Sequence, residues 1–408
     1  ASHFDVHTAY AAVNRIRVND MHPHIYKTTD DGRTWKEIIN GLPDDPVNVV
    51  REDPVRKGLL FAGTERAFYV SFDDGDHWQP LRLNMPATSI RDVVIKDNDL
   101  LAGTHGRGFW ILDDISALRQ LNTASSTVLY KPAPAYRVRW NMNTDTPLPQ
   151  EEPAGQNPPD GAIIDYNLDQ DAGKDITLEI TDAKGNLVRR FSGNDHPYDI
   201  PPVNIPLYWI RPQEMLSGER GAHRFIWDLH YTPLNLPPSY PIAAVYRNTA
   251  PDPTSPWVLP GTYTVKLTCN GKSYSQPLVI KMDPRVKTSP KDLQIQHDLS
   301  LQCYQDRQKM MQVLDEISEH RKSLEKQLSG NNDPKLQQKM DMLTKLQNMA
   351  RGNHEPSFGL LENNFAALHN ILQDSDMPPT TQTIAAVKEA LANEQTMMKK
   401  WEEVKKTL

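Results

Sequence analysis

Two short segments place paired aspartates at a regular spacing, and paired carboxylates are the groups used in acid–base chemistry on sugars. Asp30 and Asp31 stand in one segment, and Asp73 and Asp74 stand in its counterpart 43 residues further on. A glycosidase needs two carboxyl groups that converge on one substrate. A repeated turn places each pair at the edge of its own repeat. We therefore interpret these aspartates as turn residues and predict no catalytic residue in this chain.

The turn has a physical reason in each copy. The first aspartate can accept backbone N–H bonds, the glycine adopts a positive φ, and the tryptophan begins the next strand and packs between repeats. The residues predicted to form these structural turns are Thr28, Asp30, Gly32, Trp35, Ser71, Asp73, Gly75 and Trp78.

The segments around the turns repeat as well. Leu60–Thr64 recurs as Leu100–Thr104, and Phe68–Val70 recurs as Phe109–Ile111, at offsets of 40 and 41 residues. Units of about 40 to 45 residues with four short strands are typical of β-propeller blades. The third unit has no Gly-x-x-Trp after Asp114. We expect about three blades, the last without its outer strand, from the C-terminal part of a longer protein.

The repeated turn, Ser/Thr-x-Asp-x-Gly-x-x-Trp, resembles the Asp-box (BNR repeat) of sialidase-type, sortilin-type and photosystem assembly-factor propellers. In those families the box is a structural turn away from the ligand face. The resemblance implies that residues 1–121 form the last blades of an Asp-box propeller. A first partner is then the remaining N-terminal propeller segment, in the same or a separate chain.

A glycine-rich loop at 103–108 is the most distinctive candidate binding element. It joins two predicted strands on the face opposite the Asp-box, and its His105 and Arg107 offer a titratable group and a planar donor fork. The equivalent loop of the preceding repeat contributes Glu65 and Arg66. We predict that these four residues contact a ligand. The alternative is a tight hairpin in which Arg107 pairs with a neighbouring carboxylate, Asp113 or Asp114.

Other candidate sites have simpler interpretations. His22 and His24 have no acidic or cysteine partner at a metal-binding spacing, so we expect surface histidines. The stretch Asn167–Gly173 departs from a calcium loop at its glycine and its twelfth position, and we expect a polar turn. The aromatic residues of the middle region could stack on sugars or fill a core. We predict neither a metal site nor a cofactor.

Composition excludes several classes of protein. The 408 residues carry a net charge of −7, without the basic excess that nucleic-acid binding requires. No apolar stretch reaches the roughly 18 to 20 residues of a membrane span, and no signal peptide opens the chain. Cys269 and Cys303 are too few for a disulfide scaffold. We expect no nucleic-acid partner and no transmembrane segment.

The rest of the chain divides by its proline content, with 20 of 33 prolines between Tyr130 and Pro260 and 5 after Ser289. We predict a proline-rich connector over 122–165 and a β-sandwich over 166–287, because short alternating strands are separated by turn residues. This segment resembles the immunoglobulin-like module of flagellar hook-capping proteins. Helical periodicity and capping residues predict an α-helical bundle of four helices over 288–408.

The whole pattern resembles large bacterial proteins described as sortilin-like or sialidase-like propeller proteins. The fold class is therefore multidomain and mainly β with an α-helical C-terminus: a partial Asp-box propeller, a β-sandwich and a helical bundle. The resemblance implies an exported protein, whether periplasmic, on the outer surface or secreted. We expect a noncatalytic scaffold that binds a protein, peptide or glycan. The alternative is a sialidase-like or xyloglucanase-like glycoside hydrolase whose catalytic residues lie in further N-terminal blades.

Overall fold

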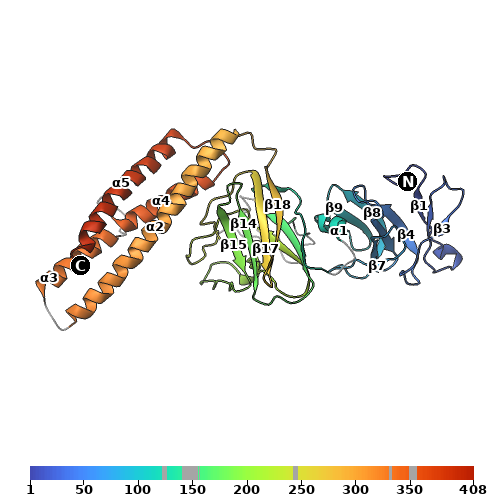
Figure 1. The fold of residues 1–408 in the computed structure, drawn as a ribbon, viewed down its shortest axis with the longest axis horizontal. Coiled ribbons are helices and arrows are strands. Elements are labelled where there is room, and N and C mark those ends of the chain that lie inside the picture. Colours follow the sequence, from blue (N-terminus) through green and yellow to red (C-terminus); the bar gives the residue numbers. More distant parts are fainter. Residues whose placement is uncertain (122–125, 140–154, 156, 242–246, 330–332, 349–355) are drawn as a thin grey trace.

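The computed structural model describes residues 1–121, 126–139, 155, 157–241, 247–329, 333–348 and 356–408. The molecule is elongated, and three groups of elements follow one another in chain order: small β-sheets, a pair of sheets and a set of long helices (Figure 1). The prediction of a mainly β chain with a helical C-terminal part is confirmed. Of the connector predicted over 122–165, residues 122–125, 140–154 and 156 lie outside the described residues.

The first group consists of three antiparallel sheets with strand orders β1-β2-β3, β4-β5-β6-β7 and β10-β9-β8, which we call the first, middle and third sheets. A 3-10 helix, η1 (Ile16–Val18), lies between β1 and β2, and a short helix, α1 (Ser116–Gln120), follows β10. The strands are β1 (Ala9–Ala12), β2 (Ile25–Thr28), β3 (Lys36–Glu37), β4 (Val47–Glu52), β5 (Leu60–Thr64), β6 (Phe68–Ser71), β7 (Gln79–Pro80), β8 (Ser89–Lys96), β9 (Asp99–His105) and β10 (Phe109–Leu112).

One strand register recurs in the three sheets and defines their equivalent residues. The equivalent pairs across neighbouring strands are Ala12 with Ile25, Gly63 with Phe68, and Gly103 with Phe109. One apolar core lies between the first and middle sheets, and a second lies between the middle and third sheets. The middle sheet is therefore covered on both faces, and all four residues of its strand β6 are buried.

The second group, which we call the two-sheet unit, has two sheets with strand orders β11-β13-β16 and β12-β18-β17-β14-β15. Both sheets contribute to one core, which contains Ile164 and Phe225 of the three-stranded sheet with Leu178 and Val265 of the five-stranded sheet. A 3-10 helix, η2 (Leu207–Trp209), precedes β16. The strands are β11 (Val128–Leu129), β12 (Ala135–Arg137), β13 (Ala162–Leu168), β14 (Ile176–Thr181), β15 (Leu187–Ser192), β16 (Gly221–Trp227), β17 (Gly261–Cys269) and β18 (Lys272–Met282).

The third group, the helical unit, contains α2 (Pro290–Leu328), α3 (Pro334–Gln347), α4 (Phe358–Gln373) and α5 (Thr381–Lys405). Each helix begins at a residue whose side chain accepts a backbone N–H of the first turn: Ser289, Asp333, Ser357 and Thr380. Helices α2, α4 and α5 pack around one apolar core (Figure 1). None of the described helices has the length and apolar character required to cross a membrane.

An arginine clamp joins the third sheet to the two-sheet unit. Arg224 Nε lies 2.9 Å from Asp165 Oδ1, and Arg224 Nη2 lies 2.9 Å from Asp165 Oδ2. The same guanidinium donates to the backbone oxygens of Asp113 and Asp114 at 2.6 and 2.7 Å. This contact orients the first group against the second.

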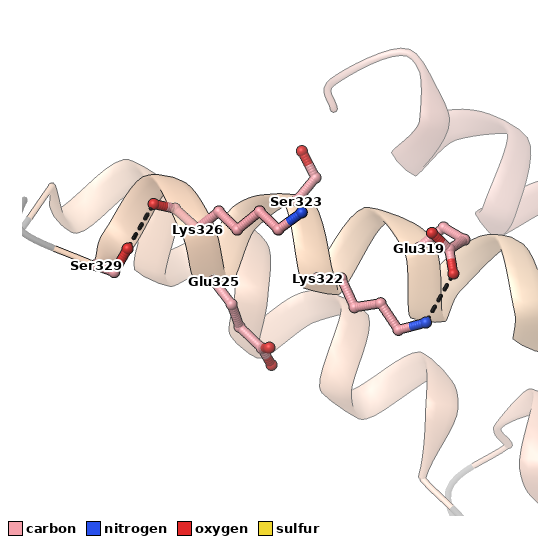
Figure 2. A pocket seen from close by; sticks show the side chains of 6 residues that line it. All are labelled: Glu319, Lys322, Ser323, Glu325, Lys326 and Ser329. Atoms are coloured by element: carbon pink, nitrogen blue, oxygen red, sulfur yellow. Dashed lines mark hydrogen bonds and ion pairs between the residues drawn. The ribbon is translucent and has the colours of Figure 1, made fainter.

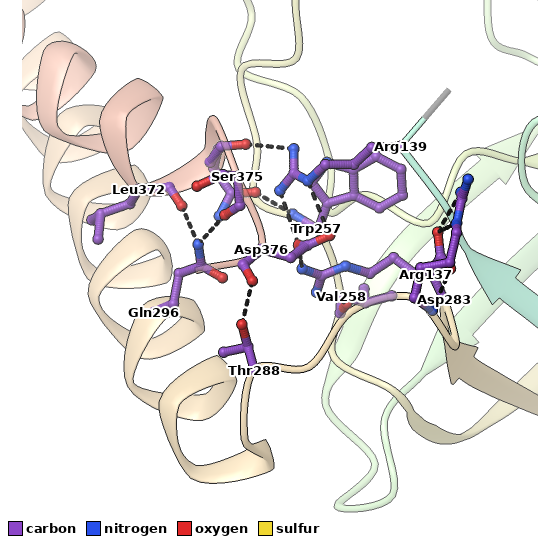
Figure 3. Close-up of polar contacts among 12 residues, drawn as sticks. Arg137, Arg139, Trp257, Val258, Asp283, Thr288, Gln296, Leu372, Ser375 and Asp376 are labelled. Atoms are coloured by element: carbon purple, nitrogen blue, oxygen red, sulfur yellow. Dashed lines mark hydrogen bonds and ion pairs between the residues drawn. The ribbon is translucent and has the colours of Figure 1, made fainter. Parts of the chain in front are cut away.

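A buried polar cluster joins the two-sheet unit to the helices (Figure 3). Arg137 and Arg139 both pair with Asp376, and Arg139 Nε lies 3.1 Å from Asp376 Oδ2. Both guanidinium groups also lie 5.7 Å from the centre of the Trp257 ring. Arg137 further donates to the backbone oxygen of Val258 at 2.9 Å. The predicted domain boundaries at 121, 165 and 287 stay predictions.

Candidate functional site

Three hairpins lie at corresponding ends of the three small sheets. Each is closed by an equivalent backbone bond: Val13 N to His24 O at 3.0 Å, Thr64 N to Ala67 O at 3.0 Å, and Thr104 N to Gly108 O at 3.1 Å. We call residues 13–24, 64–67 and 104–108 the hairpin face. The equivalence follows from the shared register of strands β1–β2, β5–β6 and β9–β10.

The structure brings the second and third hairpins together. Thr88 N donates to the backbone oxygen of Arg66 at 3.2 Å. The next residue, Ser89, pairs with His105 across strands β8 and β9. The hairpins that contain Arg66 and His105 therefore meet at one end of neighbouring sheets.

Bulged strands supply side chains to the same end. The register of β4 shifts at Asn48, and the register of β8 shifts at Arg91, which is the equivalent residue. Asn14 donates to Asn48 Oδ1 at 2.6 Å and to Glu65 Oε1 at 3.3 Å. Arg91 Nη1 lies 3.0 Å from Glu65 Oε1. A bulge redirects a side chain, so these residues connect one sheet to the next.

Of the four predicted ligand residues, Glu65 is engaged in these contacts between sheets, whereas His105 and Arg107 are exposed. The alternative pairing of Arg107 with Asp113 or Asp114 is wrong. In the described part of the chain no carboxylate lies within ion-pair distance of Arg107. Asp114 Oδ1 instead accepts the N–H of Ser116 at 2.9 Å, because α1 starts there.

Arg66 also projects from its hairpin. Its side chain is 80% exposed, and its only described charge partner is Asp45, whose Oδ1 lies 3.8 Å from Arg66 Nε. This distance is too long for a hydrogen bond. The second oxygen of Asp45 accepts the Arg66 backbone N–H at 3.0 Å, so Asp45 holds the hairpin rather than the guanidinium.

The backbone conformation of the third hairpin explains two of its glycines. Gly106 and Gly108 have φ values of 91° and 66°, and a Cβ at either position would meet no atom within 4 Å. Glycine adopts this conformation without steric cost. These two glycines are thus explained by the hairpin itself, whereas the exposed Arg107 is not required by the fold.

The first hairpin contains an unforeseen charge cluster around His24. Asp20 Oδ2 lies 3.1 Å from His24 Nε2, and Glu37 Oε1 lies 3.0 Å from Nδ1. His22 is a surface histidine as expected and lies 2.9 Å from Asp44, whereas the side chain of His24 is only 13% exposed. The hydrogen bond that His24 donates to Glu37, together with the one to Asp20, outweighs burial and raises the pKa of His24. Glu37 and Asp44 stand 13 and 22 residues from their histidines, so spacing alone could not reveal those two contacts, whereas Asp20 is only four residues from His24.

The two repeated Asp-Gly turns lie at the opposite ends of the sheets. Thr34 N–H and hydroxyl donate to Asp30 at 2.9 and 2.7 Å, and these bonds lower the pKa of Asp30. Burial raises the pKa of Asp73, but bonds from His77 and Ser71 outweigh it and leave the pKa lowered. Within each turn Gly32 and Gly75 have φ values of 81° and 91°. Both carboxylates are therefore fixed as turn acceptors.

The two turn tryptophans differ. Trp78 is 4% exposed and donates its Nε1–H to Ile38 O in the first sheet at 2.8 Å. Trp35 is 46% exposed and donates to Gly32 O within its own turn at 3.2 Å. The expected packing between repeats thus occurs for Trp78 and does not occur for Trp35, because no described sheet precedes the first one.

The remaining candidates are occupied by protein contacts. Asp171 Oδ1 in the calcium-like stretch accepts the Arg220 N–H at 2.7 Å, and Asn167 donates to Ser126 O. Trp227 is buried in the core of the two-sheet unit. Throughout the described ranges, no three His, Cys, Asp or Glu side chains gather as a metal site would require.

An open groove runs along the C-terminal part of α2 (Figure 2). Glu319 and Lys322 pair there at 2.8 Å, and Ser329 Oγ donates to Lys326 O at 2.7 Å. These contacts are those of an exposed helix surface. The hairpin face is therefore the stronger candidate site.

Comparison with known proteins finds similar solved structures, at low sequence identity, but no protein family. No protein-family model and no curated protein matches the chain. A GH74 enzyme of Niastella koreensis is 14% identical, with a TM-score of 0.23, over 46% of this chain and 27% of its own. An ancestral GH74 enzyme is 10% identical, with a TM-score of 0.23, over 66% and 51%.

A third structure is the extracellular domain of a hybrid two-component system protein from B. thetaiotaomicron. It is 10% identical, with a TM-score of 0.19, over 65% of this chain and 29% of its own. The chain thus spans between 27% and 51% of the length of these structures. A likeness at this level of overlap assigns neither a fold nor an activity to the chain.

Proposed function

We propose that residues 1–121 are the last blades of an Asp-box propeller in an exported scaffold protein, which binds a protein, peptide or glycan through the hairpin face. The chain supplies no catalytic residue in this proposal. The two-sheet unit, as an immunoglobulin-like sandwich, and the helical unit would hold or present the propeller. The proposed partner in the ring is the remaining propeller segment, in the same or a separate chain.

The observation that supports ligand binding most directly is the exposed guanidinium of Arg107. It lies at the tip of a hairpin that meets the Arg66 hairpin, and no described carboxylate lies within hydrogen-bond distance of either guanidinium. A planar guanidinium binds a carboxylate through two parallel hydrogen bonds. The hairpin face is therefore suited to a ligand that carries carboxylate groups.

The experiment is a calorimetric titration of the full chain with three probes: polygalacturonate, neutral xyloglucan and a polyglutamate peptide. We expect heat of binding with a carboxylate-bearing probe, weakened by added salt, and none with xyloglucan. Absence of binding to all three probes contradicts the proposed chemistry. A parallel assay for reducing ends distinguishes the glycoside hydrolase alternative, because hydrolysis by this chain would replace the scaffold proposal.

A further inference from the structure

We propose that the junction between the two-sheet unit and the helical unit is an acid-sensitive latch, which is closed while three buried histidines are neutral and opens when they take up protons, with both units still folded. The histidines are His230 of the two-sheet unit, His297 of α2 and His369 of α4. This inference concerns the shape of the chain, and it does not depend on ligand binding at the hairpin face.

The junction can open without exposing either apolar core. Among the described residues, the core of the two-sheet unit and the core of the helical unit have no member in common. Polar bonds cross between the units instead: Tyr304 Oη donates to Thr232 O at 2.8 Å, and Gln373 Oε1 accepts the N–H of Trp257 at 2.9 Å. Polar interfaces within one chain permit relative motion of the parts that they join.

The hydrogen bonds of His230 fix its imidazole in the neutral form. Its Nδ1 lies 2.8 Å from the backbone oxygen of Asp228, which can only accept, so Nδ1 carries the hydrogen. Its Nε2 is buried and has no hydrogen-bond partner among the described residues. A proton added at Nε2 would therefore have no acceptor. Burial, together with Arg137, outweighs the carboxylates of Asp228 and Asp160 and lowers the pKa of His230.

His369 approaches the same place from the helical side. It is 1% exposed, and its Nε2 likewise has no partner in the part of the chain that the structure describes. Its Nδ1 lies 3.5 Å from Asn370 Oδ1. Burial lowers the pKa of His369 to about 4, and the charges of Arg307 and His230 act in the same direction. A proton on either His230 or His369 therefore disfavours a proton on the other while the junction is closed.

His297 forms a bond across the junction that depends on its neutral form. Its Nδ1 lies 3.3 Å from Asp298 Oδ1, and its Nε2 lies 3.3 Å from the hydroxyl of Tyr231 in the two-sheet unit. With the hydrogen on Nδ1, Nε2 accepts from Tyr231, and a proton at Nε2 removes this acceptor. Burial outweighs the attraction of Asp298, Arg137 opposes the added charge as well, and the pKa of His297 is lowered.

The fixed charges of the junction are already positive in sum. Two guanidinium groups, those of Arg137 and Arg139, share the carboxylate of Asp376 (Figure 3). Burial raises the pKa of Asp376, but the bonds from Arg139 and Arg137 outweigh it and leave the pKa lowered. Asp376 therefore keeps its charge while the histidines begin to take up protons. Opening brings water to the imidazoles and separates their new charges from the two guanidinium groups.

The direction of the pH effect follows from these shifts. Each of the three histidines has a pKa below its ordinary value of 6.5 in the closed state. The open state, in which water reaches the imidazoles, binds more protons than the closed state. The closed state is therefore favoured above about pH 6.5 and loses its advantage as the pH falls below that value.

Pulsed EPR distances between spin labels test the inference on the full chain. Labels on Thr262→Cys in the two-sheet unit and Gln395→Cys in the helical unit report the junction, because both positions are exposed and the native cysteines are buried. The control pairs lie within one unit: Lys184 with Thr262, and Gln308 with Gln395. Between about pH 7.5 and about pH 4.5 we expect a reversible change in the 262–395 distance and unchanged distances in both control pairs.

Variants identify the histidines as the groups that respond. The triple variant His230→Asn, His297→Gln, His369→Asn should stay closed at the lower pH, and His297→Gln alone should shift the midpoint of opening to lower pH. The matched control is His320→Gln, at an exposed position of α2, which should open as the wild type does.

Three results overturn the inference. The first is a 262–395 distance that does not change in acid. The second is a change in the control pairs at the same pH, since the units would then be unfolding and not separating. The third is a midpoint of opening in His297→Gln equal to that of the wild type and of His320→Gln. The single variant decides this last point even where the triple variant does not fold.

Discussion

Asp30 and Asp73 make the same hydrogen bonds in two successive sheets. Asp30 Oδ1 accepts the N–H of Thr34 at 2.9 Å, and Asp73 Oδ1 accepts the N–H of His77 at 2.9 Å. The hydroxyl two residues before each aspartate donates to the same oxygen: Thr28 Oγ1 to Asp30 Oδ1 at 2.8 Å, and Ser71 Oγ to Asp73 Oδ1 at 2.9 Å. These carboxylates close turns in both sheets.

The first prediction concerns the Asp73 turn. Asp73→Ala should destabilise the chain by about 1 to 2 kcal/mol, because it removes the acceptor of the His77 N–H and the Ser71 hydroxyl. Denaturant unfolding measures this loss. The control is Asp76→Ala in the same turn, whose exposed pair with Lys36 should contribute little. An equal loss for both variants would contradict the assignment.

The second prediction compares the two turn tryptophans. Trp78→Phe should cost about 1 to 3 kcal/mol, since it leaves the buried Ile38 oxygen without its donor. Trp35→Phe should change the free energy of unfolding far less, because Trp35 is 46% exposed and bonds only within its own turn. Thermal melts compare the two variants. A larger loss of stability for Trp35→Phe than for Trp78→Phe would contradict the prediction, because it would show that the Trp35 side chain is covered.

The strands and turns of the small sheets could be predicted because they are local. The strand at Phe68–Val70 recurs in the next repeat, and the Asp-Gly turn at Asp74 and Gly75 depends on a few neighbouring residues. The bulge at Arg91 could not be predicted, since a register shift depends on which strand lies alongside. The clamp by Arg224 joins residues more than a hundred positions apart, as does the pairing of Arg137 with Asp376.

In the candidate site, too, local features could be predicted and contacts between sheets could not. The repeat predicted that Glu65 and His105 occupy equivalent hairpins, because equivalence follows from sequence alignment within the chain. It did not predict that Glu65 is engaged by Asn14 and Arg91, because those contacts form between sheets. Nor could spacing predict that Glu37, which is 13 residues away, lies beside His24. Three-dimensional packing, and not local preference, decides which polar side chains remain free.

The third prediction is a loss of stability in acid through His369. Burial lowers the pKa of His369 to about 4, so its imidazole is neutral in the folded protein. The unfolded chain takes up the proton near the ordinary value of 6.5. This stabilisation is therefore present above pH 6.5 and is lost as the pH falls toward 4, by about 3 kcal/mol in total.

Urea unfolding of the wild type and of His369→Asn at about pH 7 and about pH 4.5 measures this effect. The variant should lose less stability on acidification than the wild type, because asparagine does not titrate. Burial also lowers the pKa of His230 and of His297, so some acid sensitivity should remain in the variant. The same pH dependence in both proteins would contradict the prediction for His369.

The fourth prediction concerns the junction of the two-sheet unit with the helices. Asp376→Asn should destabilise the chain by about 3 to 5 kcal/mol, because it leaves the buried guanidinium groups of Arg137 and Arg139 without a counter-charge. Asp374→Asn is the matched control, since Asp374 is exposed two residues away. Unfolding in guanidinium chloride, followed by circular dichroism, compares the stabilities of the two variants. Equal stability of the two variants would show that the cluster does not hold the junction.

The most direct test of the central claim is the affinity of the hairpin face for a carboxylate-bearing ligand. Arg107→Lys keeps the positive charge and removes the planar donor fork. The control, Arg33→Lys, makes the same change at an exposed residue at the opposite end of the sheets. Both variants are titrated with the carboxylate-bearing probe that the wild type binds. Arg107→Lys should weaken binding by about tenfold while Arg33→Lys leaves it unchanged. Unchanged affinity in Arg107→Lys, with folding intact, would contradict the claim that this face recognises the ligand.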